Sequence, residues 1–498
     1  MHDCCSQEGH TKCKPVPFAP LRLLTVGLNG ESIKLVERDT TTVRAEYTTL
    51  SYCWGSSIHL CTTKETLPTF REGIPLDLIP KTLADAIYIT RALGIPHLWI
   101  DALCIVQDDE EEWQHEAANM FKIYQGSQLT ISAVQSRDSS QGCFPFNECN
   151  PQNAQVFFRT RPDDSNGHRS IVRVYRGDIR DSTMVDSAIS SRGWILQEQL
   201  LSPRLVFVMQ SEVHWHCQAG YQTQSGLSFE PVSTLPSRTM VIPYSLQLDE
   251  QWYRIAWRNI VENYSKREFT FSRDRVPAIA GITQLFASIL DDVSILGLWG
   301  KSFARDLAWL RGDGRPQMSD VSGFPSWTWF TCQGCILYTI GDKHAGQEAR
   351  VVENLQLLDW HVQWQATPYT SPVKSVQVRV QGPVQHIQIT PFAEGNSFTP
   401  PYFQVFGEDL KPGAKTKIPW RCAGQFDAGD ARVASKYLCL LLFSETKSSW
   451  PGYVFECFLI VEPVELSTGV GYKRLGLARI WGESPTFNPV KTMSLVLI

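Results

Sequence analysis

The chain has 498 residues, of which 43% are hydrophobic and 19% charged, as in folded globular proteins of two or three domains. Its net charge of −5 and its lack of a Lys/Arg block argue against a nucleic-acid or anionic membrane surface. We find neither the ~18-residue apolar run of a membrane span nor the apolar core of a secretory signal. Its 14 irregularly spaced cysteines therefore favour reduced thiols, and we expect a cytoplasmic protein.

Residues 47–134 alternate between strand and helix signals. A β-rich run at 47–55 is followed by an amphipathic helical segment at 79–96, bounded by Pro80 and by Gly94 with Pro96. A short buried strand follows at 97–100, then a helix at 108–126 with an acidic first turn, and another strand at 128–134. This alternation predicts an α/β fold with a parallel sheet covered by helices.

Residues 135–188 interrupt the alternation. Two β-like runs flank Asn166-Gly167 and predict an inserted hairpin. A helix at about 190–200, a strand at 204–209 and a β-like run at 212–217 resume the pattern. We therefore expect an α/β domain over 45–220, preceded by a tail at 1–44.

The second half of the chain changes character. Residues 221–345 are predicted to form a linker and a helical region, with helices at 250–269, 276–290 and 303–312 and an extended segment at 324–331. Residues 346–498 are dominated by strand signals, which predict a β-rich domain with antiparallel pairing.

Polar and aromatic side chains gather where the predicted parallel strands end, which is where open α/β sheets bind ligands. Three of these residues end the first strand, three follow the second strand, and three lie on the 190–200 helix. The candidate site residues are Ser51, Tyr52, Trp54, Asp101, Cys104, Gln107, Arg192, Trp194 and Glu198.

These residue types suit a polar ligand that carries a ring. Tyr52 and the two tryptophans offer stacking surfaces, and Arg192 could pair with phosphate or carboxylate. Asp101 and Glu198 are the predicted catalytic acid, base or ion stabiliser. A structural interpretation stays open for each: core tryptophans, an Asp101 turn cap, an Arg192–Glu198 ion pair and an inert Cys104 thiol.

The N-terminal segment contains Cys4, Cys5, His10 and Cys13, a set that zinc could use. The spacing matches no common zinc knuckle, and adjacent Cys4 and Cys5 would strain a tetrahedral site. We therefore expect a loose tail here and predict no metal site. His214 and His216, which alternate on one β face, are predicted to be structural.

Several stretches together resemble the fungal heterokaryon incompatibility (HET) domain. They are YTTLSYCWG, IPKTLADAI, LGIPHLWIDALCIVQDDEEEWQHEAANMFKIY, SRGWILQEQLLSPRLVFV and WHC, in order over 47 to about 217. Later pieces such as FPSWTWF and GYKRLGLARI are also similar to full-length members. The resemblance implies a filamentous fungal protein of self/non-self recognition and programmed cell death.

HET domains are in turn thought to be remote relatives of Toll/interleukin-1 receptor (TIR) domains, which implies a TIR/flavodoxin-like sheet. Leu50-Ser51-Tyr52 is similar to the first-strand element of TIR domains, and Asp101 to their Asp after the second strand. Trp194 and Glu198 have the spacing of the TIR Trp-Cys-x-x-Glu helix, whose Glu is needed to cleave NAD, although Ile195 replaces the Cys.

Three functions remain open at this stage. The first is a HET domain that binds or cleaves NAD or a related nucleotide, as an NAD glycohydrolase-like hydrolase. The second is a tailoring enzyme of fungal secondary metabolism acting on a small aromatic or polyketide-like substrate. The third is a catalytically silent interaction module with a protein partner or self-association. We predict no required cofactor, with NAD as a possible substrate.

Overall fold

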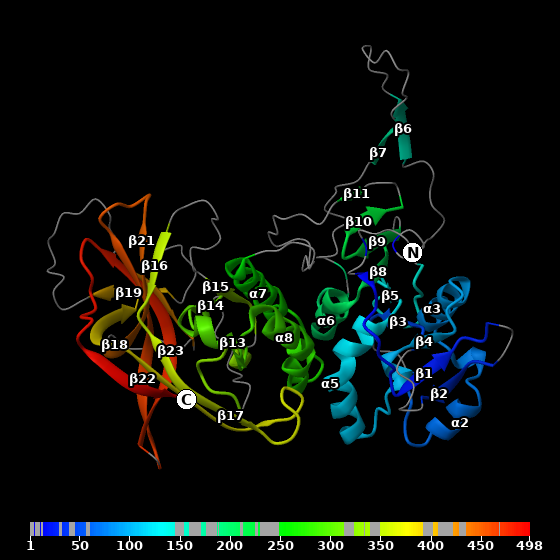
Figure 1. Cartoon of the computed structure of the whole chain (residues 1–498), viewed down its shortest axis with the longest axis horizontal. Coiled ribbons are helices and arrows are strands. Elements are labelled where there is room, and N and C mark those ends of the chain that lie inside the picture. The colour runs from blue at the N-terminus through cyan, green and yellow to red at the C-terminus, as the bar shows by residue number, and fades with distance from the viewer. Residues whose placement is uncertain are drawn as a thin grey trace. The chain divides into compact units, whose positions relative to one another are not determined.

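The structure, a computed structural model, covers two compact units, Met1–Leu246 and Gln247–Ile498, which we describe separately (Figure 1). The residues that it describes are 4, 10, 13–28, 32–38, 45–55, 60–144, 154–158, 171–175, 187, 189–209, 213–224, 228–229, 249–312, 323–332, 334–338, 349–391, 402–406, 422–427, 435–467 and 469–498.

The first unit is built on a mixed sheet whose centre is parallel. Four parallel strands lie in the order β4 (His97–Trp99), β3 (Tyr47–Ser51), β5 (Leu129–Ser132) and β8 (Arg204–Val208). In chain order these are the second, first, third and fourth strands of the parallel set. The predicted parallel pairing is confirmed for these four strands, within a sheet that is mixed as a whole. The chain continues from β3 to β4 on one side of the β3–β5 pair and from β5 to β8 on the other.

Antiparallel strands extend both edges to a total of nine described strands. They are β1 (Arg22–Thr25) and β2 (Lys34–Glu37) beyond β4, and β9 (Val213–Cys217), β10 (Gly220–Thr223) and β11 (Ser228–Phe229) beyond β8. The segment 1–44, expected to be a tail, thus supplies two strands, and Leu23 and Leu24 are fully buried. Four-residue strands are too short to show a reliable alternation in sequence.

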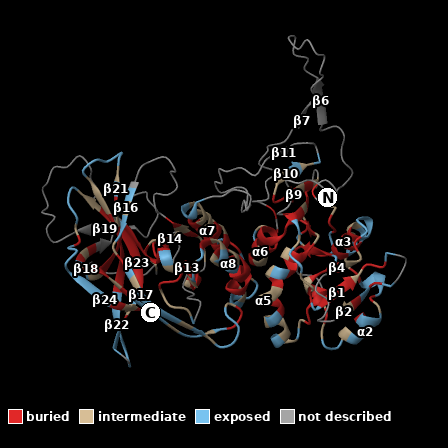
Figure 2. Ribbon diagram, viewed as in Figure 1, coloured by how far each residue is buried: buried red, intermediate tan, exposed pale blue. Residues whose placement is uncertain are grey.

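Helices cover both faces of this sheet. The predicted helices are present as α3 (Lys81–Ala92), α5 (Glu110–Gly126) and α6 (Gly193–Leu201), and the short α2 (Leu67–Glu72) and α4 (Asp101–Cys104) were not predicted. Successive strand residues point to opposite faces. The Thr48 hydroxyl meets that of Thr90 on α3, whereas the Tyr47 hydroxyl donates to the Ile123 carbonyl on α5. The sheet is consequently buried on both sides (Figure 2).

The predicted insert contains β6 (Ala154–Phe158) and β7 (Ile171–Tyr175), which pair antiparallel. The hairpin is thus confirmed, while Asn166-Gly167, expected at its turn, lies outside the described residues.

The second unit begins with α7 (Glu250–Ser265) and α8 (Pro277–Leu290), both predicted. The helix expected at 303–312 is wrong beyond its first turn. α9 covers only Phe303–Asp306, and β14 (Trp309–Arg311) then pairs with β15 (Ile336–Tyr338). The remaining short elements of this region are the 3-10 helices η6 (Ser272–Arg275) and η7 (Gly300–Ser302) and the antiparallel pair β12 (Ser294–Ile295) and β13 (Leu298–Trp299). The first unit also contains a 3-10 helix, η2 (Leu76–Leu78).

The segment 324–331, expected to be extended, is a second correction. It ends in a 3-10 turn, η8 (Trp329–Thr331), and Trp327 and Trp329 are fully buried. The Trp309 indole donates to the Trp327 carbonyl at 3.0 Å, so tertiary packing of large rings decides the local backbone here.

The β-rich region closes into a barrel. Pairing runs from β21 through β22, β23, β20, β19 and β18 and returns to β21. The strands of this sheet are β16 (Ala349–Glu353), β17 (Gln356–Trp364), β18 (Val373–Pro391), β19 (Tyr402–Phe406), β20 (Cys422–Phe426), β21 (Ser435–Lys447), β22 (Val454–Leu466), β23 (Gly469–Gly482) and β24 (Thr492–Leu497). The predicted antiparallel pairing is confirmed, with β23–β24 as a parallel exception.

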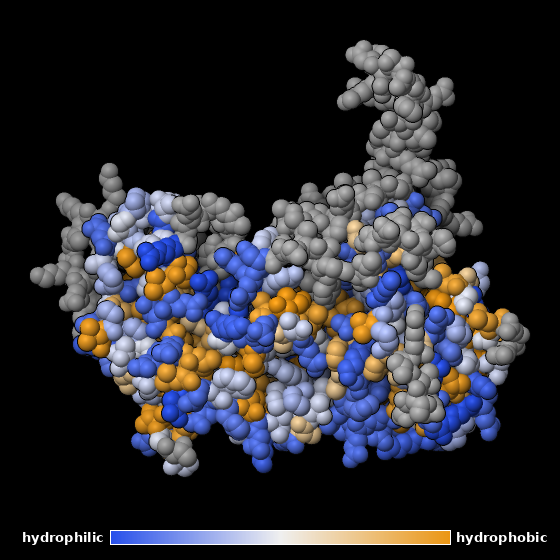
Figure 3. All heavy atoms as spheres, in the orientation of Figure 1, coloured by the Kyte–Doolittle hydropathy of each residue, from blue (hydrophilic) through white to orange (hydrophobic). Residues whose placement is uncertain are grey.

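No helix among the described residues is long and apolar enough to cross a membrane. On the face drawn in Figure 3, hydrophobic residues are interspersed among hydrophilic ones over the described surface. Such scattered exposed apolar side chains are normal for a folded chain and mark no site by themselves.

Arg474 of β23 joins the barrel to the helical region. Its fully buried guanidinium donates to both Asp427 carboxylate oxygens, at 2.7 and 3.2 Å. It also donates to the Leu307 and Trp309 carbonyls, at 2.7 and 2.6 Å, and lies 3.5 Å above the Trp309 ring centroid. Residues of the predicted segments 221–345 and 346–498 therefore pack against each other within the second unit.

Replacing Arg474 by Lys should destabilise the second unit by about 2–4 kcal/mol, because an ammonium cannot keep the planar bidentate contact or serve both carbonyls. Urea denaturation measures this change. Arg379→Lys is the matched control, since Arg379 pairs with Asp359 at 3.5 Å on the surface and should change stability by less than about 0.5 kcal/mol. Equal effects of the two substitutions would contradict the role given to Arg474.

Candidate functional site

The loops after β3 and β5 meet at the carboxyl edge of the parallel strands. Ser51, the last residue of β3, is the register partner of Ser132, the last of β5. The Ser139 amide donates to the Trp54 carbonyl at 3.2 Å, and Gly55 has φ +82°, where a Cβ would clash with Asp138. Since the connections leave β3 and β5 in opposite directions, this edge is the point where open α/β sheets bind ligands.

Asp101 begins α4, one residue beyond the end of β4, and its carboxylate accepts two hydrogen bonds. The Trp54 indole Nε1 donates to Oδ2 at 2.9 Å, and the Ala102 amide donates to Oδ1 at 2.8 Å. Burial raises the pKa of Asp101, whereas these two hydrogen bonds and the charge of Arg192 lower it. The predicted neighbours Trp54, Asp101 and Arg192 are therefore brought together.

Glu198 lies on α6, of which every residue except Trp194 is buried. A chain of hydroxyl contacts fastens this helix to the sheet: Thr49 to Thr130 at 2.7 Å, Thr130 to Ser202 at 2.6 Å, and Ser202 to the Glu198 carbonyl at 2.6 Å. Thr49 and Ser51 are two residues apart on β3 and share a face. Glu198 is thus set against the sheet face that carries Ser51.

The Glu198 carboxyl has an unusual acidity for a glutamate. Burial raises its pKa from 4.5 to about 7, and the negative charge of Asp101 adds to the rise. The Ser51 and Tyr124 hydroxyls and the positive charge of Arg192 act in the opposite direction. A carboxyl that titrates near neutrality among charged neighbours is typical of functional sites.

Two hydroxyls at this edge are buried and unsatisfied. Ser51 Oγ lies beside the Glu198 carboxyl without a hydrogen bond of standard geometry, and Ser132 Oγ has no partner within the described part of the chain. Both residues are 0% exposed. Unsatisfied buried hydroxyls cost about 1–3 kcal/mol each, so their presence calls for a functional explanation.

The remaining aromatic and cationic residues form the border of this group. Arg192 is the N-cap of α6, and its charge reaches Tyr52 and Cys53 as well as the two carboxyls. Trp194 is partly buried and packs edge-on against Trp113 at 6.4 Å. Tyr52 is buried, and burial together with the Asp101 charge raises its pKa well above 10.

Two predicted ligand-binding residues have other roles. Cys104 is 0% exposed in the hydrophobic core, where burial raises its pKa to about 12, and this position favours the inert-thiol interpretation over contact with a ligand. The Gln107 amide donates to the Asp101 and Ile105 carbonyls at 3.0 and 3.1 Å and fixes the turn of α4. In a one-turn helix, neighbouring side chains point in different directions. The spacing of Asp101, Cys104 and Gln107 in the sequence therefore does not show which of them face the candidate site.

Tyr124 and Ser132 also belong to this site, and the sequence alone does not indicate it. Tyr124 has helical spacing with Met120, which identifies a buried face but not the use of its hydroxyl. Its Oη donates to the Leu50 carbonyl at 3.3 Å and lies by Glu198. In the sequence, Ser132 is one residue of a predicted strand, and its position beside Ser51 depends on the register between the two strands.

The N-terminal Cys/His set is a further correction. Cys4 and Cys13 are buried rather than part of a loose tail, and they pack against Cys217 of β9. The possible ligand atoms of Cys4, His10, Cys13 and Cys217 all lie within 4.8 Å of one another. Cys5 lies outside the described residues. The fourth member was missed because it follows His10 by 207 positions.

Residues 47–198 match the family model described as heterokaryon incompatibility protein (HET). The chain carries a HET domain. No curated protein and no solved structure matches the chain. The HET match begins with β3 and ends at Glu198, so it contains the parallel strands β3, β4 and β5, helix α6 as far as Glu198, and every described residue of the carboxyl-edge group.

The raised pKa of Glu198 predicts a loss of stability of the HET domain with rising pH. The folded chain binds more protons than the unfolded chain between pH 4.5 and about 7, so the unfolding free energy falls across this window, by on the order of 3 kcal/mol. Glu198→Gln removes the titration and should raise the denaturation midpoint at pH 8 relative to the unmodified protein.

Denaturation midpoints measured from pH 5 to 8 check this expectation. Glu111→Gln, an exposed glutamate of α5, is the matched control and should leave the pH dependence unchanged. Parallel curves for the unmodified protein and Glu198→Gln would show that the Glu198 carboxyl is not held as described.

Proposed function

We propose that the HET domain binds NAD or a related dinucleotide at the carboxyl edge of its parallel strands and cleaves the nicotinamide–ribose bond. The observation that carries this proposal is the buried Glu198 carboxyl, with a pKa of about 7, beside Asp101, Arg192 and the buried Ser51 hydroxyl. Acidic, cationic and hydroxyl groups at one edge suit a ligand with sugar hydroxyls and a diphosphate.

The strand order supports a TIR/flavodoxin-like assignment for this domain. The second, first, third and fourth parallel strands lie side by side, which is the order of flavodoxin-like sheets, and their ligands bind between the first and third strands. Trp194 and Glu198, spaced i and i+4 on α6, follow the TIR pattern of a tryptophan before the NAD-cleaving glutamate. This relation is one of pattern and supports the choice of substrate class.

In the proposed reaction the bond between C1′ of the ribose and the nicotinamide nitrogen breaks, and its electron pair leaves with nicotinamide. Positive charge develops on the ribose, and the Glu198 carboxylate stabilises it more in the transition state than in the ground state. Water then adds to C1′ and releases a proton, so the products are nicotinamide and ADP-ribose. Arg192 would hold the diphosphate, while Trp54 and Trp194 offer ring surfaces.

The match to the heterokaryon incompatibility family supports a role for this activity in heterokaryon incompatibility. Consumption of a nucleotide cofactor would link recognition of a non-self partner to cell death in the fungal cytoplasm. The second unit, Gln247–Ile498, would then sense a partner or regulate the HET domain.

Release of nicotinamide from NAD by the purified chain tests the proposal. We expect Glu198→Gln to reduce the rate at least 100-fold, since an amide cannot stabilise a developing cation as a carboxylate does. Because the carboxylate is the active form, the rate of the unmodified protein should rise from pH 6 to 8. Glu111→Gln is the control and should keep full activity.

Equal rates for Glu198→Gln and the unmodified protein would remove Glu198 from the mechanism. A chain that neither releases nicotinamide nor binds ADP-ribose in calorimetry would instead support a silent interaction module. The deep burial of Glu198, which is 6% exposed, is the observation that favours that alternative.

A further inference from the structure

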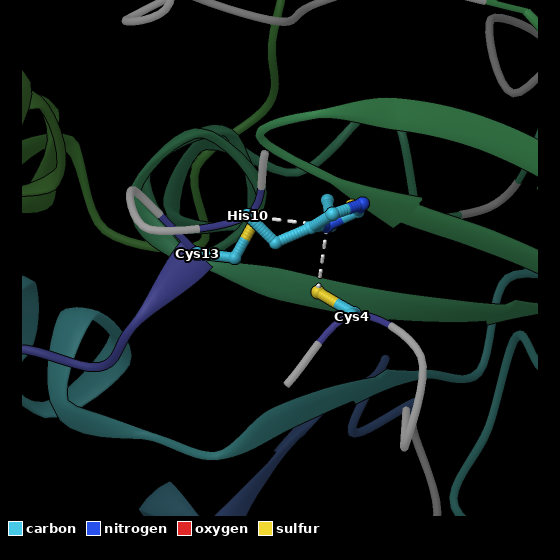
Figure 4. Close-up of side chains that lie close together, drawn as sticks. Cys4, His10 and Cys13 are labelled. Carbon is cyan, nitrogen blue, oxygen red and sulfur yellow. Dashed lines mark hydrogen bonds between the residues drawn. The ribbon is translucent and has the colours of Figure 1, made fainter. Parts of the chain in front are cut away.

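Three thiols and one imidazole, all of which can bind a metal ion, lie close together although they come from distant parts of the chain. His10 Nδ1 lies 3.2 Å from Cys4 Sγ and 3.6 Å from both Cys13 Sγ and Cys217 Sγ. Figure 4 shows the side chains of Cys4, His10 and Cys13 converging. All three cysteines are free thiols.

These separations have the dimensions of a tetrahedral zinc site. Zn–S distances of about 2.3 Å and Zn–N distances of about 2.0–2.1 Å imply ligand-to-ligand separations of roughly 3.6–3.8 Å. The three nitrogen–sulfur distances are 3.2–3.6 Å, and all four ligand atoms lie within 4.8 Å of one another. A small shift of the side chains would bring each to bonding distance of a central ion.

We propose that Cys4, His10, Cys13 and Cys217 bind one Zn²⁺ in a closed structural site. Thiolate and imidazole ligands select zinc over the hard cations Mg²⁺ and Ca²⁺. Four protein ligands leave no open position for water or substrate, which separates structural zinc sites from catalytic ones. The site is independent of the function proposed for Glu198.

The surroundings of the four ligands suit a charged metal centre. Three thiolates and one Zn²⁺ carry a net charge of −1. The buried Arg204 guanidinium, whose Nε donates to Cys4 Sγ at 3.4 Å, would neutralise it. Arg204 is itself fixed by a hydrogen bond to the Gln128 carbonyl at 3.1 Å, and Cys217 accepts further hydrogen bonds from the Ala219 backbone and the Trp215 side chain. Such outer contacts orient metal ligands and tune their charge.

The location indicates what the ion does. Cys217 ends β9 and pairs in register with Arg204, the first residue of β8, so the site lies at the amino edge of the parallel strands. The candidate site around Glu198 lies at the carboxyl edge of the same sheet. Zinc would therefore fasten the N-terminal segment to the antiparallel edge and stabilise the unit without entering its chemistry.

Metal analysis of the full-length protein, purified with reductant and loaded with zinc chloride, tests the site. We expect one zinc per chain and at least a tenfold lower content in Cys217→Ser. Cys61→Ser, a partly exposed thiol outside the group, is the matched control and should keep one zinc. An unmodified protein that binds no zinc, or a Cys217→Ser protein with full zinc content, would overturn the proposal.

A second measurement does not depend on whether the variants fold. Cobalt(II) loaded into the unmodified protein should show the absorption of tetrahedral coordination together with thiolate-to-cobalt charge transfer, and chelation should lower the thermal unfolding midpoint. Octahedral cobalt absorption without a thiolate band, or a disulfide between two of the three cysteines in the reduced preparation, would contradict the site.

Discussion

The burial of the Glu198 carboxyl between α6 and the central sheet is the constraint on which the chemistry proposed for the HET domain depends. Burying a charged carboxylate costs free energy unless it is paired, so burial favours the protonated form. This effect raises the pKa of Glu198 to about 7. The hydroxyl chain from Thr49 to Ser202 leaves α6 little freedom to move the group toward solvent. The burial of Glu198 thus lowers the free energy of unfolding, and it places an ionisable group with a pKa near neutrality where the proposed function would use it.

The two edges of the parallel strands have opposite character. The carboxyl edge gathers Asp101, Arg192 and Glu198 with unsatisfied serine hydroxyls, an arrangement that lowers stability and favours polar ligands. The amino edge gathers Cys4, Cys13 and Cys217 with Arg204, an arrangement suited to holding chain segments together.

The second unit depends on a different buried charge. Arg474 is fully satisfied by Asp427, two backbone carbonyls and the Trp309 ring, so its burial stabilises the packing of the barrel against the helical region. Glu198 and Arg474 show two uses of a buried ion. A completely paired ion holds elements together, whereas an incompletely paired ion is available for chemistry.

The sequence by itself determined the elements whose signals are local. The apolar spacing and end residues of 79–96 and 108–126 predicted α3 and α5, and the strand-ending positions of Ser51 and Asp101 predicted which edge carries polar groups. Only the tertiary structure decided that Cys104 faces the core, that Cys217 joins Cys4, His10 and Cys13, and that β1 and β2 belong to the sheet. The reason is physical: periodicity and capping act between neighbours along the chain, whereas strand register and side-chain convergence depend on contacts between residues more than 200 positions apart, such as Cys4 and Cys217.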